Sequence, residues 1–211
     1  MAGLFITFEG GEGSGKSTQV SRLAQALRKL GRSVATTREP GGTTGADMIR
    51  EMVLGGDAEA FGNDVEAALF AAARADHVDS VIAPALAGGT DVICDRFHDS
   101  TRVYQGRGDN AHYLAALEDA AMGDCRPEMT FILDLPAEEG LRRAAARRET
   151  ATADRFEAEA LSLHEERRLA FLAIAAREPE RCHVVDARRP ADVVADDILA
   201  RVSERLGLKE V

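Results

Sequence analysis

Five short runs of apolar residues recur along the chain, each ending in a polar residue. They begin at Leu4, Ser33, Asp91, Thr130 and His183. Continuous apolar runs of this length are typical of strands that are buried on both faces of a parallel sheet. Between the runs, apolar residues repeat every three or four positions, as over residues 20–30 and 65–86, which is the spacing of an amphipathic helix. The pattern predicts an α/β fold, a doubly wound five-stranded parallel sheet flanked by helices.

The polar residues at the ends of these runs are the first candidates for a functional site. In a doubly wound sheet, ligands bind beside the carboxyl ends of the strands, which meet at one edge. Glu9, Arg38, Asp95 and Asp134 are expected at such strand ends. No internal repeat and no linker interrupts the alternation of strands and helices, so we expect residues 1–211 to form a single domain.

Charge and cysteine content narrow the possible functions. The net charge of −10 lacks the basic surface that nucleic-acid binding requires, so we expect no nucleic-acid partner. The three cysteines are odd in number and far apart, which argues against a disulfide framework and is typical of a reduced cytoplasm. No apolar run reaches the roughly 18 residues of a membrane span, and the first strand follows Met1 too closely for a signal peptide. We therefore expect a cytoplasmic protein without a membrane partner.

The segment after the first expected strand matches a phosphate-binding loop, or P-loop. Residues 10–17 read G-G-E-G-S-G-K-S, which fits G-x-x-x-x-G-K-[ST], and an expected helix follows. In such a loop, backbone N–H groups surround the β-phosphate, Lys16 reaches the β- and γ-phosphate oxygens, and Ser17 coordinates Mg²⁺. The predicted ATP-binding residues here are Gly10, Gly11, Glu12, Gly13, Ser14, Gly15, Lys16, Ser17 and Thr18. The alternative, a glycine-rich turn without a ligand, is disfavoured by the strand–loop–helix context.

A P-loop alone leaves open a GTP-dependent switch, an ATP-driven motor and a kinase. The chain contains neither the D-x-x-G nor the N-K-x-D of a GTP switch, and it has no L-S-G-G-Q-like signature of an ABC-type ATPase. The remaining class with a short P-loop domain is the kinases of nucleotides and other small molecules. Such a kinase needs a second phosphate site for its acceptor.

Three further motifs supply residues for an acceptor site. They are R-E-P-G-G-T at Arg38, L-F-A-A-A-R at Leu69 and D-R-F-H-D-S-T-R-V-Y-Q-G at Asp95. Together with the loop, and with D-R-F-E at Asp154 and D-A-R-R-P at Asp186, they closely resemble the thymidylate kinase family over nearly the whole chain. The resemblance implies a fold of the P-loop NTPase type with a short helical lid. It also implies transfer of the γ-phosphate of ATP to dTMP, giving dTDP and ADP in dTTP synthesis.

Three residues of these motifs have roles that follow from their chemistry. Arg74 and Arg96 are cations that could hold the 5′-phosphate of the acceptor and stabilise its attacking oxygen. Surface ion pairing is the alternative for both arginines. Asp95, at a strand end, could hold Mg²⁺ through water.

The resemblance implies further contacts with dTMP. Phe70, one helical turn from Arg74, is expected to stack on thymine, although on pattern alone it would be a core residue. Tyr104 is expected to exclude a ribose 2′-hydroxyl. The other residues expected beside dTMP are Arg38, Pro40, Ser100, Thr101 and Gln105. Pro40 would shape the turn that carries Arg38, and capping of nearby backbone is an equally good interpretation of Ser100 and Thr101.

Glu12 places a carboxylate inside the phosphate loop, where it would repel ATP. Two like charges about 4 Å apart repel by roughly 1 kcal/mol in water and by more in a protein. The resemblance implies that this acid points away from ATP, toward the 3′-hydroxyl of the acceptor's deoxyribose. We also expect it to help hold Arg38 in place. Glu12 is therefore predicted to bind the acceptor's sugar and position its nucleophile, although it belongs to the ATP-binding loop.

Several arginines lie close together over residues 142–157 of this acidic chain. Such a run is ordinarily a solvated helix face. Phosphoryl transfer needs positive charge at the γ-phosphate, however, and the loop contains no arginine. Thymidylate kinases without a basic loop residue supply that arginine from a lid, so the resemblance implies a lid over about residues 142–157. The candidates are Arg147, Arg148 and Arg155 for the transferred phosphate, and Arg143, Arg188 and Arg189 for adenine.

The sequence thus predicts an ATP- and Mg²⁺-dependent thymidylate kinase in which Lys16, Arg96 and a lid arginine act on the transferred phosphate. The family resemblance also implies a homodimer. Two alternatives stay open at this point. One is a P-loop kinase for another nucleoside monophosphate, and the other is a nucleotide-binding protein without transfer chemistry.

Overall fold

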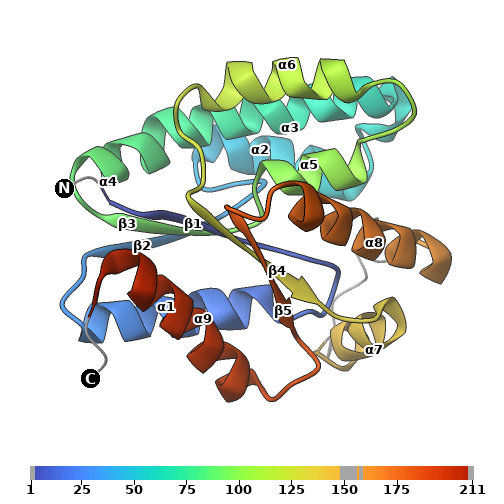
Figure 1. Ribbon diagram of the computed structural model, residues 1–211. Helices are drawn as coiled ribbons and strands as arrows, with labels where there is room; N and C mark the ends of the chain where they lie inside the picture. The colour runs from blue at the N-terminus through green and yellow to red at the C-terminus, as the bar shows by residue number, and fades with distance from the viewer. Residues whose placement is uncertain (1–2, 148–155, 157–158, 209–211) are drawn as a thin grey trace.

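Five parallel strands form the sheet of the protein (Figure 1). The computed structural model describes residues 3–147, 156 and 159–208. The strands are β1 (Phe5–Glu9), β2 (Val34–Arg38), β3 (Asp91–Asp95), β4 (Met129–Asp134) and β5 (Cys182–Asp186), in the spatial order β2-β3-β1-β4-β5. Every pairing is parallel, and Phe8 of β1 is in register with Asp95 of β3 and Phe131 of β4. The predicted doubly wound sheet is confirmed.

Helices cover both faces of the sheet (Figure 1). On one face, α1 (Lys16–Lys29) and α9 (Ala191–Leu206) pack on β1, β3, β4 and β5 through residues such as Leu27 and Ile198. Against the other face lie a π-helical turn, η2 (Val78–Ile82), with α5 (His98–Tyr104), α6 (Ala111–Met122) and α8 (Leu161–Arg177). The remaining helices are α2 (Thr44–Gly55), the short η1 (Glu59–Phe61), α3 (Asn63–His77), α4 (Ala83–Ala87) and α7 (Ala137–Arg147).

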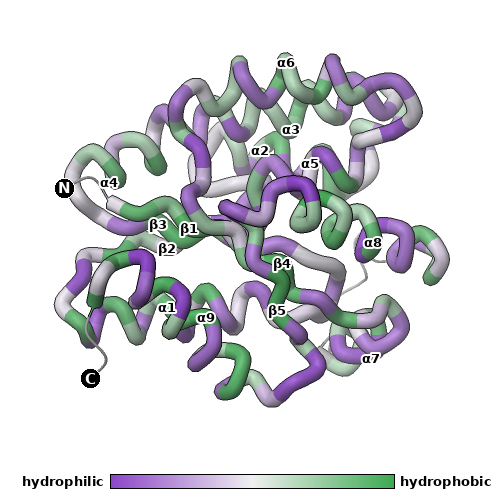
Figure 2. Tube along the Cα trace, viewed as in Figure 1, coloured by the Kyte–Doolittle hydropathy of each residue, from purple (hydrophilic) through white to green (hydrophobic). Residues whose placement is uncertain are grey.

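The central strand β1 shows why an apolar run predicts this position. All five of its residues, F-I-T-F-E, are fully buried. Ile6 and Phe8 face α1 and α9, whereas Phe5 packs edge-on against Phe97 on the opposite side. A strand covered on both faces exposes neither side to water, and Figure 2 shows the apolar colour on the strands and on the inner sides of the helices. No helix in the described ranges is long and apolar enough to cross a membrane.

The helical segment expected over residues 65–86 is present, but its helix type changes along its length. α3 continues directly into η2 and then into α4. Pro84 lies in the first turn of α4 and has no N–H to donate to the preceding turn. A local π turn before the proline lets the helix continue past this missing hydrogen bond.

Candidate active site

The phosphate loop joins β1 to α1 at the carboxyl edge of the sheet. Gly15, the residue before α1, has a φ of 95°, a left-handed conformation that glycine adopts without strain. None of the described side chains caps the N-terminus of α1. The first N–H groups of the helix are therefore available to an anionic ligand, as expected of a P-loop.

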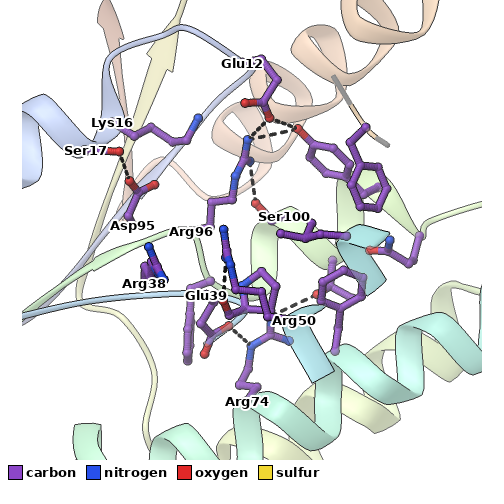
Figure 3. Close-up of a pocket in the computed structure, with 18 of the residues that line it drawn as sticks. Glu12, Lys16, Ser17, Arg38, Glu39, Arg50, Arg74, Asp95, Arg96 and Ser100 are labelled. Atoms are coloured by element: carbon purple, nitrogen blue, oxygen red, sulfur yellow. Dashed lines mark hydrogen bonds and ion pairs between the residues drawn. The ribbon is translucent and has the colours of Figure 1, made fainter. Parts of the chain in front are cut away.

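Lys16 and Ser17 begin α1 and point toward different partners. Lys16 is 8% exposed, and its Nζ donates to the carbonyl oxygens of Gly10 at 3.1 Å and Gly11 at 2.9 Å. Burial, together with the nearby Arg96, lowers the pKa of Lys16 below its ordinary value. Ser17 Oγ donates to Asp95 Oδ2 at 2.6 Å (Figure 3). The lysine thus lies within the loop, and the two predicted Mg²⁺ ligands are adjacent.

One pocket connects the loop with all three acceptor motifs (Figure 3). Of the predicted site residues, it is lined by Glu12, Gly13, Gly15, Lys16, Ser17, Arg38, Pro40, Phe70, Arg74, Asp95, Arg96, Ser100, Thr101, Tyr104 and Gln105. We call this cavity the acceptor pocket. Residues that are far apart in the sequence meet there because β1, β2 and β3 end at the same edge of the sheet.

Glu12 forms an ion pair with Arg96 in the acceptor pocket (Figure 3). Tyr104 also donates to the carboxylate, at 3.2 Å. Burial by itself would raise the pKa of Glu12, but the positive charges of Arg96 and Lys16 lower this pKa to about 2. The expectation that Glu12 holds Arg38 was wrong, because Arg38 ends β2, which β3 separates from β1, whereas Arg96 follows β3 itself. The acid of the loop is instead tied to an arginine of the acceptor side.

Arg96 has an unusual backbone conformation. Its φ is 68°, and among the non-glycine residues that the structure describes it is the one with a positive φ. Its N–H donates to the carbonyl of Phe8 at 2.9 Å, and its guanidinium donates to Ser100 Oγ at 3.1 Å. Such a conformation costs about 1–3 kcal/mol and persists only where the surroundings enforce it. The strain at Arg96 is consistent with a functional role for its side chain.

Arg74 lies deeper in the acceptor pocket and is only 3% exposed. Its Nε donates to Glu39 at 2.8 Å, and its Nη2 donates to Thr101 Oγ1 at 3.0 Å. His77 is hydrogen-bonded to the other oxygen of Glu39 at 3.1 Å. Surface ion pairing therefore does not describe Arg74. Its charge is already balanced by Glu39 inside the protein.

Two further arginines border the same cavity. Arg38 is exposed, and no side chain in the described ranges forms an ion pair with it. Arg50 of α2 was missed by the sequence analysis; it donates to the carbonyl of Pro40 at 2.8 Å. The other lining residues missed are Glu39, Leu54, Phe97 and Phe156. The R-E-P motif contains Glu39, whereas an arginine in an amphipathic helix gives no local signal of a site.

A second pocket lies on the other side of the loop. The predicted residues that line it are Gly13, Ser14, Gly15, Thr18, Arg143, Arg188 and Arg189. Residues not singled out are Gln19, Arg142, Ala146, Ala187, Pro190, Ala191 and Val194. Arg143 is held across this pocket by a hydrogen bond to the carbonyl of Ala187 at 2.9 Å. Gly13 and Gly15 line both pockets, so the loop is a wall that the pockets share. Gly10 and Gly11 line neither pocket.

The loop also touches α7 through two glycines. A Cβ atom added at Gly13 would lie 1.9 Å from the carbonyl oxygen of Gly140, and one added at Gly140 would lie 2.3 Å from the carbonyl oxygen of Glu12. Real Cβ atoms essentially never approach within 3.0 Å. The phosphate loop and α7 therefore meet backbone to backbone.

Most of the predicted lid lies outside the described residues. The side chain of Arg147, at the end of α7, and the whole of Arg148 and Arg155 belong to that part of the chain. Their assignment to the transferred phosphate stays a prediction. Phe156, which is described, lines the acceptor pocket and packs edge-on against Tyr104 with ring centroids 5.4 Å apart.

Comparison with known proteins agrees with this geometry. Residues 8–198 match the family model for thymidylate kinase. The chain is 53% identical over 205 residues to the thymidylate kinase of Nitrobacter winogradskyi, covering 96% of this chain and 89% of that protein. It is 52% identical over 209 residues to the thymidylate kinase of Rhodopseudomonas palustris strain TIE-1, covering 98% of this chain and 91% of that protein.

A solved structure extends the similarity to the fold. The crystal structure of thymidylate kinase from Ehrlichia chaffeensis matches with a TM-score of 0.74 and 31% sequence identity, over 96% of this chain and 99% of that chain. Residues 8–198, which match the family model, include every residue that lines the two pockets. The chain therefore belongs to the thymidylate kinase family.

Proposed function

We propose that the protein transfers the γ-phosphate of ATP to dTMP and so produces dTDP and ADP for dTTP synthesis. The proposal rests on the acceptor pocket, in which the P-loop, the three acceptor motifs and Arg50 of α2 line one cavity. The second pocket supplies a place for adenine on the opposite side of the loop. The transferred phosphate would then pass along the wall that the two pockets share.

On the ATP side, the loop binds phosphate through its backbone and Lys16. The unpaired N–H groups at the start of α1 attract the β-phosphate. Lys16 exchanges its hydrogen bonds to two loop carbonyls for bonds to β- and γ-phosphate oxygens. Arg143 and Arg188 border adenine, and an arginine of the segment from Arg147 to Arg155 neutralises the γ-phosphate as it moves.

On the dTMP side, Arg38 is the arginine of the three acceptor motifs for which the described ranges show no ion pair, whereas Arg96 is paired with Glu12. Arg74 contributes hydrogen-bond donors rather than net charge, because Glu39 already balances it. Arg96 holds the 5′-phosphate and stabilises the attacking oxygen, whereas Phe70 stacks on thymine. Glu12 accepts a hydrogen bond from the 3′-hydroxyl while Arg96 keeps its carboxylate in place.

Mg²⁺ is the metal that these residues fit. Ser17 and Asp95 offer oxygen ligands, which Mg²⁺ prefers, and their oxygens lie 2.6 Å apart. The described ranges contain no group of three histidine, cysteine or acidic side chains that could hold a metal ion alone. Mg²⁺ in kinases is bound by one or two protein groups together with substrate phosphates. When bound, with Asp95 acting through water, it would neutralise phosphate charge.

We further propose a homodimer that functions in the cytoplasm. Apolar side chains are exposed on neighbouring helices α2, α3 and α6, for example Met48 at 68%, Val65 at 45% and Tyr113 at 39%. The Tyr113 hydroxyl donates to the carbonyl of Asp64, so α6 and the start of α3 are in contact. Light scattering coupled to size exclusion would give about twice the mass of one chain, and the mass of one chain would contradict a dimer.

A coupled assay of ADP formation tests the proposed reaction. The protein is incubated with ATP, Mg²⁺ and either dTMP, dUMP, dCMP, AMP or no acceptor. Turnover should be fastest with dTMP and should stop when EDTA removes the metal. Faster turnover with a different monophosphate would favour another nucleotide kinase. Binding of ATP without ADP formation from any acceptor would favour a protein without transfer chemistry.

A further inference from the structure

Glu9 is a buried carboxylate that has no role in the proposed reaction. It ends β1 directly before the phosphate loop and is fully buried. Burial, and the negative charge of Asp99 nearby, raise the pKa of Glu9 to about 7. A strand residue in this position would ordinarily be apolar, so the partners of the carboxylate should explain its presence.

Among the described residues, all hydrogen bonds to the carboxylate of Glu9 come from the segment that follows Arg96. Its Oε1 accepts from the N–H of Phe97 at 2.8 Å and from the N–H of Ser100 at 3.2 Å. Its Oε2 accepts from Ser100 Oγ at 2.6 Å. Glu9 therefore fixes the backbone immediately after the strained residue Arg96 and the first turn of α5.

Ser100 extends this contact to the guanidinium of Arg96. Its hydroxyl has one proton, which it donates to Glu9 Oε2, and its lone pairs are left to accept. Arg96 Nη1 donates to this oxygen at 3.1 Å, while Arg96 Nη2 pairs with Glu12. A continuous chain of hydrogen bonds therefore runs from Glu9 through Ser100 and Arg96 to Glu12. Figure 3 shows the part of this chain that lies in the acceptor pocket, from Ser100 through Arg96 to Glu12.

We propose that Glu9 is a positioning residue that sets both the backbone turn and, through Ser100, the guanidinium direction of Arg96, and thereby prepares the acceptor pocket for a 5′-phosphate. This inference rests on the proposed function of Arg96. Glu9 itself does not line the pocket, so it acts without touching the nucleotide. A phosphate ligand should depend on Glu9 more strongly than the same nucleoside without phosphate.

The test compares binding of dTMP and thymidine by calorimetry, expressed as the ratio of the two dissociation constants. Glu9→Gln keeps the shape and an acceptor for the two N–H groups but removes the acceptor for the hydroxyl of Ser100. The preference for dTMP over thymidine should fall by about 2- to 12-fold, which corresponds to one hydrogen bond. The KM for ATP should stay unchanged, and the KM for dTMP should rise.

Thr7→Val is the matched control. Thr7 is also fully buried on β1, and its hydroxyl is hydrogen-bonded to that of Thr130 at 2.7 Å, away from Arg96. This variant should lower the melting temperature without changing the preference for dTMP. If it changed the preference as much as Glu9→Gln does, the effect would be structural and the inference would be overturned.

Two further results keep the inference falsifiable. If Glu9→Gln does not fold, Ser100→Ala interrupts the same chain of hydrogen bonds, and an unchanged preference for dTMP would overturn the proposal. In the double variant Glu9→Gln with Ser100→Ala, the loss of preference for dTMP should be smaller than the sum of the losses in the two single variants, because both substitutions break the same hydrogen bond. If the unaltered protein did not prefer dTMP to thymidine, the proposed function would itself fail.

Discussion

Replacing Gly140 with alanine should disturb the phosphate loop from a distance. Gly140 lies within α7, where alanine would ordinarily stabilise a helix by about 0.5–1 kcal/mol relative to glycine. Here the added carbon would lie 2.3 Å from the carbonyl oxygen of Glu12. Neither atom can rotate away, because the Cβ is fixed to the helix backbone and the oxygen belongs to the backbone of the loop. The loop and α7 must therefore separate by about 0.7 Å to restore a contact of 3.0 Å.

The size of the kinetic effect follows from that displacement. A misplacement of about 1 Å in an active site can lower the rate about 10²-fold. A shift of roughly 0.7 Å should therefore lower kcat by about 10- to 100-fold, whether the loop or α7 moves. If the loop moves, Glu12 loses its position beside Arg96, and if α7 moves, Arg143 moves with it in the second pocket.

The assay measures kcat and both KM values by coupled ADP formation, with the melting temperature followed by circular dichroism. Gly55→Ala is the control, because Gly55 also lies in a helix and no atom would lie within 4 Å of its added carbon. The control should match the unaltered protein in turnover and be at least as stable. Identical kinetics for Gly140→Ala and Gly55→Ala would refute the reasoning.

Three other predictions concern the acids and the lysine around the loop. Lys16→Ala should abolish transfer in a folded protein, because the charge that bridges the β- and γ-phosphates is lost; near-normal turnover would contradict the role of Lys16. Glu12→Gln should lower kcat/KM for dTMP by about 10- to 150-fold. The loss should be much smaller with 3′-deoxy-dTMP, and equal losses with both substrates would show that Glu12 does not meet the 3′-hydroxyl. Because the folded protein raises the pKa of Glu9 from 4.5 to about 7, the stability that protonated Glu9 provides is complete below pH 4.5 and is lost as the pH rises through 7. As the pH rises from about 5 to about 8, the free energy of unfolding measured in urea should therefore increase for Glu9→Gln relative to the unaltered protein. A difference between the two proteins that stays constant with pH would contradict the raised pKa of Glu9.

Local patterns account for what the sequence predicted well. The central strands β1, β3 and β4 appear as apolar runs because both of their faces are covered, whereas the edge strands β2 and β5 are partly exposed. The loop appears as a motif because its glycines and Lys16 act over eight consecutive residues. Neither inference requires knowing which strands are neighbours. The same holds for the polar strand ends, which gather at one edge in any parallel sheet.

Strand order and burial account for what the sequence did not predict. The partner of Glu12 is Arg96 rather than Arg38 because β3, and not β2, lies beside β1. Arg50 enters the acceptor pocket only because α2 packs over Pro40, a contact that the amphipathic pattern of α2 does not contain. Glu9 was expected as a strand end, but its function as an acceptor depends on the turn at Arg96, which no local pattern encodes.

The central place of β1 in the sheet has a consequence for synthesis of the protein. Of the five strands, β1 is synthesised before the others, yet its two neighbours are β3 and β4, which end at Asp95 and Asp134. At about 5–20 residues per second, roughly 85 residues and 4–17 s separate the end of β1 from the end of its first neighbour. During that time the strand F-I-T-F-E has both edges unpaired, and such strands are prone to aggregate. The strand that leads into the phosphate loop thus waits for its neighbours in the sheet. Misassembly of the nascent chain would therefore affect the segment on which catalysis depends.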